Sequence, residues 1–243
     1  MKIDERLQHA IQGYWEARAK NKNKQILAGR SDTGARSEVT GGTQMSALED
    51  LITDIIVGAG ITRSDIKTRT ALELPGYYRS EKKWDLLVVS ENRLVMAMEF
   101  KSQVGPSFGN NLNNRSEEAI GSATDIWVAY REGRFGQAPA PFLGYFFLLE
   151  DCPRVKTPVR NKEPHFKVDP MFSGASYCKR YEILARRLVL ERVYTAACLV
   201  MSTRTLPAQV TQPADDLSFH RFIATLRGHV IAFQGSQSAG LLT

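Results

Sequence analysis

The sequence predicts an α/β protein in which helices flank a mixed β-sheet. Three observations support this fold class: amphipathic helices near both ends of the chain, two adjacent strands around residues 84–100, and a fully apolar strand at 142–149. Helices and strands that alternate along a chain are typical of a sheet covered by helices. The chain has 243 residues, of which 43% are hydrophobic and 24% charged, so it can bury a substantial core.

The first helix is expected over residues 4–28, a polar segment with one thin apolar stripe. A loop with four glycines follows at 29–42 and carries Arg30 and Arg36. The apolar residues of the next helix follow the i, i+3, i+4, i+7, i+8 spacing of one buried face, and they are Leu48, Leu51, Ile52, Ile55 and Ile56. Ser46 and Glu49 fit a capping box at its start, and two glycines at 58 and 60 are expected to end it.

A β-hairpin is expected next, with strands at 84–89 and 94–100 joined by a polar turn at 90–93. Side chains of the second strand alternate between two faces. One face is expected to carry Leu94, Met96, Met98 and Phe100, and the other Val95, Ala97, Glu99 and Lys101.

The second half of the chain begins with a loop at 103–114 that is rich in Gly and Asn, and a helix is expected at about 115–131. Residues 142–149 suit a strand buried on both faces. Six of the ten prolines lie between 139 and 170, which indicates an extended insertion. A long helix is expected at 176–201, and a last amphipathic helix uses Phe219, Phe222, Ile223, Leu226 and Val230, with Asp215 or Asp216 as its cap.

The chain is basic, with 32 Lys+Arg against 26 Asp+Glu and a net charge of +6. A basic protein favours an acidic partner, either nucleic acid or, less often, an anionic membrane surface. The three cysteines, Cys152, Cys178 and Cys198, form no C-x-x-C pair, which argues against a disulfide framework and against a zinc ribbon. No apolar leader or membrane-length apolar run is present, so a soluble, cytoplasmic protein is expected.

The residues that carry chemistry lie on the hairpin. Asp85 opens its first strand, and Glu99-Phe100-Lys101 closes the second. Two carboxylates are common ligands of Mg²⁺, and a lysine two residues after a carboxylate shares its strand face. The alternative is an exposed strand edge with a weak cross-strand ion pair.

This hypothesis sets a condition on the geometry of the hairpin. A two-residue turn without irregularity would place Asp85 opposite Met98 and on the other face from Glu99. A three-residue turn, or one β-bulge, would instead pair Asp85 with Glu99 and place both carboxylates on one face.

The segment from Asp85 through Glu99-Phe100-Lys101 to the Gly- and Asn-rich run that ends at Glu118 resembles the XhoI family of type II restriction endonucleases, which are PD-(D/E)xK nucleases. The proline of that motif is replaced here by Trp84. The resemblance implies a restriction-endonuclease-like mixed sheet and a single endonuclease domain over 1–243. Its catalytic core would lie at roughly 45–150, with 1–44 and 151–243 as additions for DNA binding or dimerisation.

The resemblance also implies the roles of the site residues. Asp85, Glu99 and the carbonyl of Phe100 would ligate Mg²⁺, and Lys101 would activate water and stabilise charge. The reaction would be hydrolysis of double-stranded DNA at a palindrome, with CTCGAG as the implied site, leaving 5′ overhangs and 5′-phosphate ends. A palindrome cut on both strands implies a homodimer, and a restriction system in a bacterial cytoplasm implies a cognate DNA methyltransferase.

Glu49 has two possible roles. Many PD-(D/E)xK enzymes add an acidic residue to the metal site from a helix before the hairpin, and Glu49 lies on such a helix. The alternative is the capping box with Ser46.

Two groups of residues are candidates for DNA contact. The segment 154–187 holds nine basic and three acidic residues, and its proline-rich part suits a clamp on the phosphate backbone through Arg154, Lys156, Arg160 and Lys162. Bases are read by Arg, Asn and Gln side chains, which makes Asn110, Asn111, Asn113, Asn114, Arg115, Arg30 and Arg36 candidates. The alternatives are a solvated charged surface and ordinary turn residues.

Two other functions remain open on the sequence alone. One is a repair or junction-resolving nuclease that reads DNA structure, and the other is a DNA-binding regulator without catalysis. A regulator would be indifferent to Mg²⁺ and to a change of Lys101.

Overall fold

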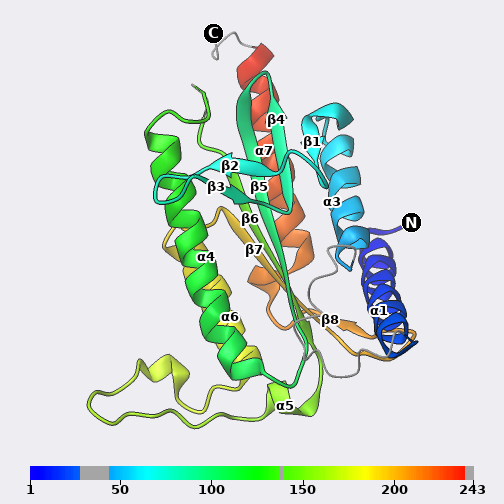
Figure 1. The fold of residues 1–243 in the computed structure, drawn as a ribbon, viewed down its shortest axis with the longest axis vertical. Helices are drawn as coiled ribbons and strands as arrows, with labels where there is room; N and C mark the ends of the chain where they lie inside the picture. Colours follow the sequence, from blue (N-terminus) through cyan, green and yellow to red (C-terminus); the bar gives the residue numbers. More distant parts are fainter. Residues whose placement is uncertain (28–43, 137–138, 239–243) are drawn as a thin grey trace.

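A central six-stranded sheet organises the molecule (Figure 1). The structure is a computed structural model and describes residues 1–27, 44–136 and 139–238. The strand order is β1-β4-β5-β6-β7-β8. The bounds are Ile66–Lys67 for β1, Leu86–Ser90 for β4, Arg93–Gln103 for β5, Phe142–Glu150 for β6, Ala196–Ser202 for β7 and Val210–Thr211 for β8. Strands β5, β6 and β7 are parallel and the other pairs antiparallel, so the predicted mixed sheet is confirmed.

Helices cover both faces of this sheet (Figure 1). Helices α1 (Ile3–Leu27), α3 (Ser46–Gly58) and α7 (Phe219–Ser238) lie on one face, and α4 (Phe108–Arg131) and α6 (Tyr177–Leu190) on the other. Because both faces are covered, all nine residues of β6 are buried, as its unbroken apolar sequence predicts.

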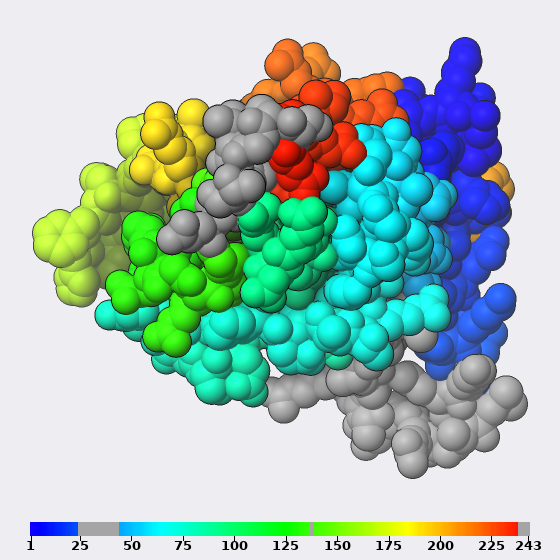
Figure 2. Space-filling model, turned by 90° about the horizontal axis from the view of Figure 1, so that it is seen from above, coloured from blue at the N-terminus to red at the C-terminus, as the bar shows by residue number. Residues whose placement is uncertain are grey.

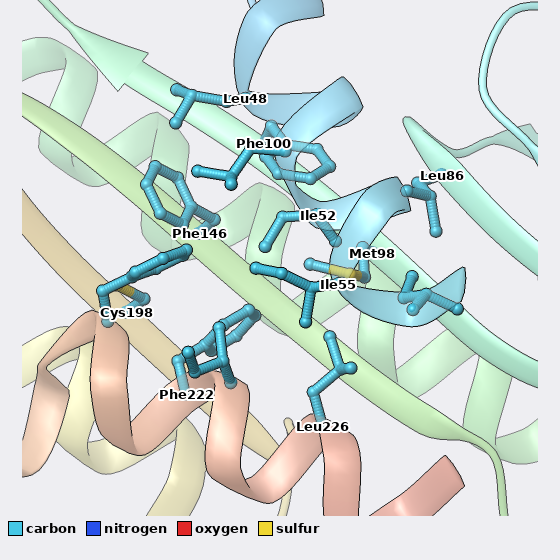
Figure 3. Close-up of a cluster of buried hydrophobic side chains, with 14 of the residues drawn as sticks. Leu48, Ile52, Ile55, Leu86, Met98, Phe100, Phe146, Cys198, Phe222 and Leu226 are labelled. Atoms are coloured by element: carbon cyan, nitrogen blue, oxygen red, sulfur yellow. The ribbon is translucent and has the colours of Figure 1, made fainter. Parts of the chain in front are cut away.

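The core on the α3 and α7 side is built from the apolar stripes that the sequence shows. Figure 3 shows Ile52 and Ile55 of α3 lying over Met98 of β5, with Phe222 and Leu226 of α7 against the same sheet. The stripe of α1 is also buried in this cluster, at Leu7, Ile11 and Trp15. Burial of these side chains fixes α3 beside β4 and β5, the two strands of the hairpin.

A small two-stranded sheet lies beside the main one. Strands β2 (Glu73–Pro75) and β3 (Glu81–Lys83) pair with each other and cross in front of β5 (Figure 1). Asp125 of α4 anchors the turn between them, because its carboxylate accepts bonds from the N–H groups of Tyr77 and Tyr78 and from Arg79 Nε, all at 2.7–2.8 Å. This hairpin is absent from the prediction, since it has no apolar alternation.

The loop predicted at 103–114 is wrong for residues 108–114, which are helical, whereas residues 104–107 are neither helix nor strand. Helix α4 begins at Phe108, and its first buried residues, Phe108 and Leu112, are one helical turn apart. Packing of this pair outweighs the weak helix propensity of Gly and Asn. The asparagines therefore lie on the first turns of a helix.

The predicted helix at 176–201 is also wrong in its second half. Helix α6 ends at Leu190, and Ala196–Ser202 is strand β7, buried at every position. A short, fully apolar run suits a buried strand and a buried helix equally well, so periodicity could not separate them. Arg192, in a left-handed conformation with φ 55°, lies in the turn between the two.

Both predicted N-caps are wrong. The N-cap of α3 is Met45, so Ser46 is already the first helical residue and not the predicted cap. Asp215 and Asp216 belong to a preceding 3₁₀ turn (Asp215–Leu217), and the N–H of Phe219 at the start of α7 is bound by Gln212 Oε1 at 2.7 Å.

The proline-rich insertion projects from the side of the molecule opposite α1 (Figure 2). It contains helix α5 (Pro153–Lys156) and a 3₁₀ turn at Pro170–Phe172, and the rest is bends, turns and irregular chain with one isolated β-bridge from Pro158 to Ser176. Its two ends follow β6 and precede α6, so it emerges at the edge of the sheet where β5 also ends.

Candidate active site

A bulge in the β4–β5 hairpin brings Asp85 and Glu99 together. The turn has two residues, Glu91 and Asn92, both with positive φ, which is typical of a tight hairpin. Val88 pairs with Met96 but Val89 with Leu94, so Val95 is an extra residue. The geometric condition set by the sequence is therefore met by a bulge.

Register beyond the bulge places the two carboxylates on one face. Leu86 pairs with Met98, so Asp85, just before β4, lies opposite Glu99. The bulge also corrects two face assignments. Leu94 is buried with α4 and Ala97, whereas Val95 is buried with Met96 and Met98 on the side of α3 and α7.

Lys101 of β5 places its ammonium beside the carboxylate of Glu99. Its Nζ lies 3.4 Å from Glu99 Oε1, and its side chain keeps 21% of its surface exposed. Asp85 Oδ2 accepts a 2.8 Å bond from the N–H of Phe100, which fixes the carboxylate at the strand edge. The structure thus brings together the three residues predicted as catalytic.

Two further residues bind Glu99, and no motif in the sequence predicts either contact. Lys82 Nζ of β3 lies 2.6 Å from Glu99 Oε1, and Tyr194, between α6 and β7, donates its hydroxyl to Oε2 at 2.7 Å. Both partners come from elements whose position depends on tertiary packing: the short β2–β3 hairpin and the turn before β7.

Glu49 approaches the site from α3. Strand β1 pairs with β4 only at Leu87 and Val88, which leaves the β4 edge open beside Asp85. Burial raises the pKa of Glu49 to about 7, and the charges of Asp85 and Asp50 add to this effect while Arg69 opposes it. Glu49 therefore lies close enough to Asp85 for the charge of one carboxylate to act on the other.

The electrostatics differ between the carboxylates. Burial raises the pKa of Asp85 and outweighs the opposing effects of Lys101 and the Phe100 N–H. Burial acts in the same direction on Glu99, but Lys101, Lys82 and the Tyr194 hydroxyl outweigh it, and its pKa is lowered. Glu99 is thus held as a carboxylate, whereas the positive charges near Glu49 and Asp85 do not fully offset the effect of burial.

These donors fit a hard divalent cation. Mg²⁺ prefers carboxylate oxygens, and the raised pKa values of Glu49 and Asp85 indicate a site that additional positive charge would stabilise. No three His, Cys, Asp or Glu side chains in the described ranges are close enough to form a complete metal-binding group.

The raised pKa of Glu49 gives a testable pH dependence. Because the folded protein holds the proton more tightly than the unfolded chain, the free energy of unfolding should fall as pH rises from about 4.5 to about 7. The difference is at most about 3 kcal/mol. Glu49→Gln should remove this part of the pH dependence in urea unfolding with a chelator present.

The matched control is Glu117→Gln, which changes an exposed carboxylate on α4. It should keep the pH dependence of the unchanged protein. Equal pH slopes for Glu49→Gln and the unchanged protein would contradict the position that we assign to Glu49.

The predicted DNA-contacting residues divide into several groups. Asn110, Asn113 and Asn114 are exposed on the first turns of α4, and Asn111 is partly buried. Arg115 pairs with Glu118 at 2.5 Å, and its Nε is buried without a hydrogen-bond partner among the described residues. Arg30 and Arg36 lie outside the described residues.

Most basic residues of the 154–187 segment are bound within the protein. Lys156 pairs with Asp151 at 2.6 Å and Arg187 with Asp169, and further ion pairs or carbonyl contacts hold Lys167, Lys179, Arg180 and Arg186. Arg154, Arg160 and Lys162 are exposed, and none of them has an ion-pair partner in the part of the chain that the structure describes. Three of the nine basic side chains are thus exposed without an internal carboxylate partner among the described residues.

Comparison with known proteins identifies the family of this chain. Residues 24–212 match the family model for restriction endonuclease XhoI, which is more than half of the chain. The chain belongs to the XhoI family of restriction endonucleases. The predicted resemblance is confirmed, and with it the prediction of a hydrolase of a restriction system.

Individual members of the XhoI family are similar over most of the chain. The type II restriction enzyme BstVI of Geobacillus stearothermophilus is 51% identical over 215 residues, covering 86% of this chain and 95% of that enzyme. XhoI of Xanthomonas vasicola is 51% identical over 67% of this chain and 66% of its own, and AbrI of Azospirillum brasilense is 47% identical over 68% and 74%. No solved structure matches the chain. Among the described helices, none has the length and apolar character to cross a membrane.

Proposed function

We propose that this protein is a Mg²⁺-dependent endonuclease that cuts both strands of DNA at a palindrome. The observation that carries the proposal is the bulged hairpin, which places Asp85 opposite Glu99 with Lys101 Nζ 3.4 Å from the same carboxylate. The sequence similarity to enzymes named type II restriction enzymes supports the same reaction class.

Each residue of the site has a separate proposed role. Asp85, Glu99, Glu49 and the carbonyl of Phe100 would hold the ion, which when bound supplies Lewis-acid charge and a water of lowered pKa. Lys101 is placed to orient the attacking water and to stabilise the negative charge that develops on the phosphate. The Phe100 N–H and the Tyr194 hydroxyl fix the carboxylates of Asp85 and Glu99 in place.

We infer the substrate and the partners from the family resemblance. The proposed site is CTCGAG, cut to give 5′ overhangs with 5′-phosphate ends. A palindrome requires two active sites related by twofold symmetry, so we propose a homodimer. A cognate methyltransferase would protect the same sequence in the host.

The direct test is incubation of the protein with a long linear DNA of known sequence, with Mg²⁺ or with a chelator. Discrete fragments are expected only with Mg²⁺, and sequencing of their ends should read CTCGAG with 5′ overhangs. Glu99→Gln should leave the DNA intact because it removes a charged ligand.

Three other outcomes would each change the proposal. Cleavage at another sequence would replace the site and keep the chemistry. Cleavage of branched DNA alone would favour a junction-resolving nuclease. Intact DNA in every reaction, from folded protein, would favour the binding-only regulator.

A further inference from the structure

The ammonium of Lys82 occupies the position beside Glu99 Oε1 that a divalent metal ion would have to take. Its Nζ is 2.6 Å from Glu99 Oε1, closer than the 3.4 Å of Lys101, and only 13% of its side chain is exposed. The ammonium also lies 4.2 Å from the ring centre of Trp84, which adds a cation–π contact. Lys82 thus has a defined position in the site, unlike Glu81 and Lys83, its exposed neighbours on β3.

Only one oxygen of Glu99 is available to a ligand. Tyr194 binds Oε2 from inside the protein, and its own side chain is buried. The other oxygen, Oε1, is bound by both lysines. A Mg²⁺ ion sits about 2.0–2.1 Å from its oxygen ligands, so it would compete with the closer ammonium for Oε1 and be repelled by its charge.

Lys82 and Lys101 differ in how they are attached. Lys101 belongs to β5 in the middle of the six-stranded sheet, two residues from Glu99 on the same face. Lys82 belongs to a separate two-stranded sheet and reaches the carboxylate with a flexible four-carbon side chain. Lys82 can therefore leave Glu99 by side-chain rotation, with the hairpin still anchored at Asp125.

We propose that Lys82 is an internal counter-ion of Glu99 that competes with the divalent metal and must leave Oε1 before the metal binds. This proposal rests on the metal site proposed above and adds a positioning residue to it. Without metal, the ammonium compensates the buried carboxylate, which would otherwise be strongly destabilising. The phosphates of bound DNA offer the displaced ammonium a new partner, so DNA and metal should each strengthen binding of the other.

The test measures binding of Mn²⁺ alone to the DNA-free protein by titration calorimetry. Lys82→Met keeps an unbranched apolar side chain near Trp84 and removes the charge, so the Kd for Mn²⁺ should fall about tenfold. Lys82→Arg keeps a positive charge and should stay within about twofold to threefold of the unchanged protein. Lys83→Met, on the same strand but exposed, is the matched control and should not change the Kd.

A merely structural role predicts the opposite result. If Lys82 only supports the shape of the site, Lys82→Met would weaken Mn²⁺ binding or leave it unchanged, and either result would overturn the proposal. If neither the unchanged protein nor Lys82→Met binds Mn²⁺, both the proposed role of Lys82 and the proposed metal site are overturned. Mg²⁺-dependent cleavage with an unchanged Kd would overturn the role of Lys82 alone.

A second measurement needs no substitution. Acylation of lysines with an amine-reactive ester, followed by mass spectrometry, reports how accessible each Nζ is. Addition of Mn²⁺ to the unchanged protein should increase labelling of Lys82 several-fold and leave labelling of Lys83 unchanged. Equal labelling of Lys82 with and without Mn²⁺ would contradict its displacement.

Discussion

Replacing Lys101 by alanine is expected to slow DNA cleavage about a thousandfold and to leave DNA binding within a few fold of the unchanged protein. The ammonium lies 3.4 Å from Glu99 Oε1, where it can hold the attacking water and stabilise charge on the phosphate. Both contributions act on the transition state, so their loss should lower the rate of the chemical step. Single-turnover cleavage with protein in excess measures this step directly.

The control for this experiment is Lys83→Ala, which removes an exposed lysine of β3. It should cleave at nearly the rate of the unchanged protein. A normal rate for Lys101→Ala would exclude Lys101 from catalysis, and loss of DNA binding in that variant would assign the lysine to binding instead. Lys82 is the other ammonium on Glu99, so an unimpaired Lys101→Ala would make Lys82 the catalytic candidate.

The hairpin shows how far sequence reasoning reaches in this protein. The carboxylates and the lysine could be identified from residue type and spacing, because the strands carry a clear apolar pattern. Whether Asp85 and Glu99 share a face depended on one residue of register. Val95 supplies that residue as a bulge, which the alternating pattern at 94–101 did not reveal.

Segments whose conformation depends on distant contacts could not be predicted in the same way. Strand β7 is apolar on both sides because helices cover both, so it lacks the alternation that identifies a half-buried strand. The first turn of α4 depends on burial of Phe108 and Leu112 rather than on the propensity of its asparagines.

The same limit applies to the partners of Glu99. Lys82 is 17 residues from Glu99 in the sequence and Tyr194 is 95 residues away. Neither lies in a motif that indicates contact with the site. Sequence reasoning therefore found the groups that do the proposed chemistry and missed those that hold one of them in place.

The exposed basic side chains of the proline-rich insertion are expected to contribute strongly to DNA binding. Replacing Arg154, Arg160 and Lys162 together by glutamine should weaken DNA binding roughly a hundredfold at about 0.1 M salt. These side chains are exposed and lack ion-pair partners among the described residues, so no internal carboxylate competes with DNA phosphate for them. Each lost phosphate contact should also reduce the slope of log K against log salt by about 0.9.

A matched triple variant distinguishes the effect of these three positions on DNA affinity from the effect of the protein's total charge. Lys156, Lys167 and Lys179 lie in the same segment but pair with Asp151, Glu163 and Glu182, and their replacement by glutamine changes the net charge equally. Exposed ion pairs contribute little to folding, so both triple variants should remain folded. Binding is measured with a chelator present, so that the DNA stays intact.

If Arg154, Arg160 and Lys162 contact DNA phosphates, two results are expected together. The loss of affinity in the Arg154, Arg160 and Lys162 variant should be the same for DNA with and without CTCGAG, since phosphate contacts carry no sequence information. The paired-lysine variant should lose much less affinity, because its side chains are already bound to carboxylates. Equal losses in the two variants would show that only total charge matters, and a loss confined to CTCGAG would place the three side chains at the bases.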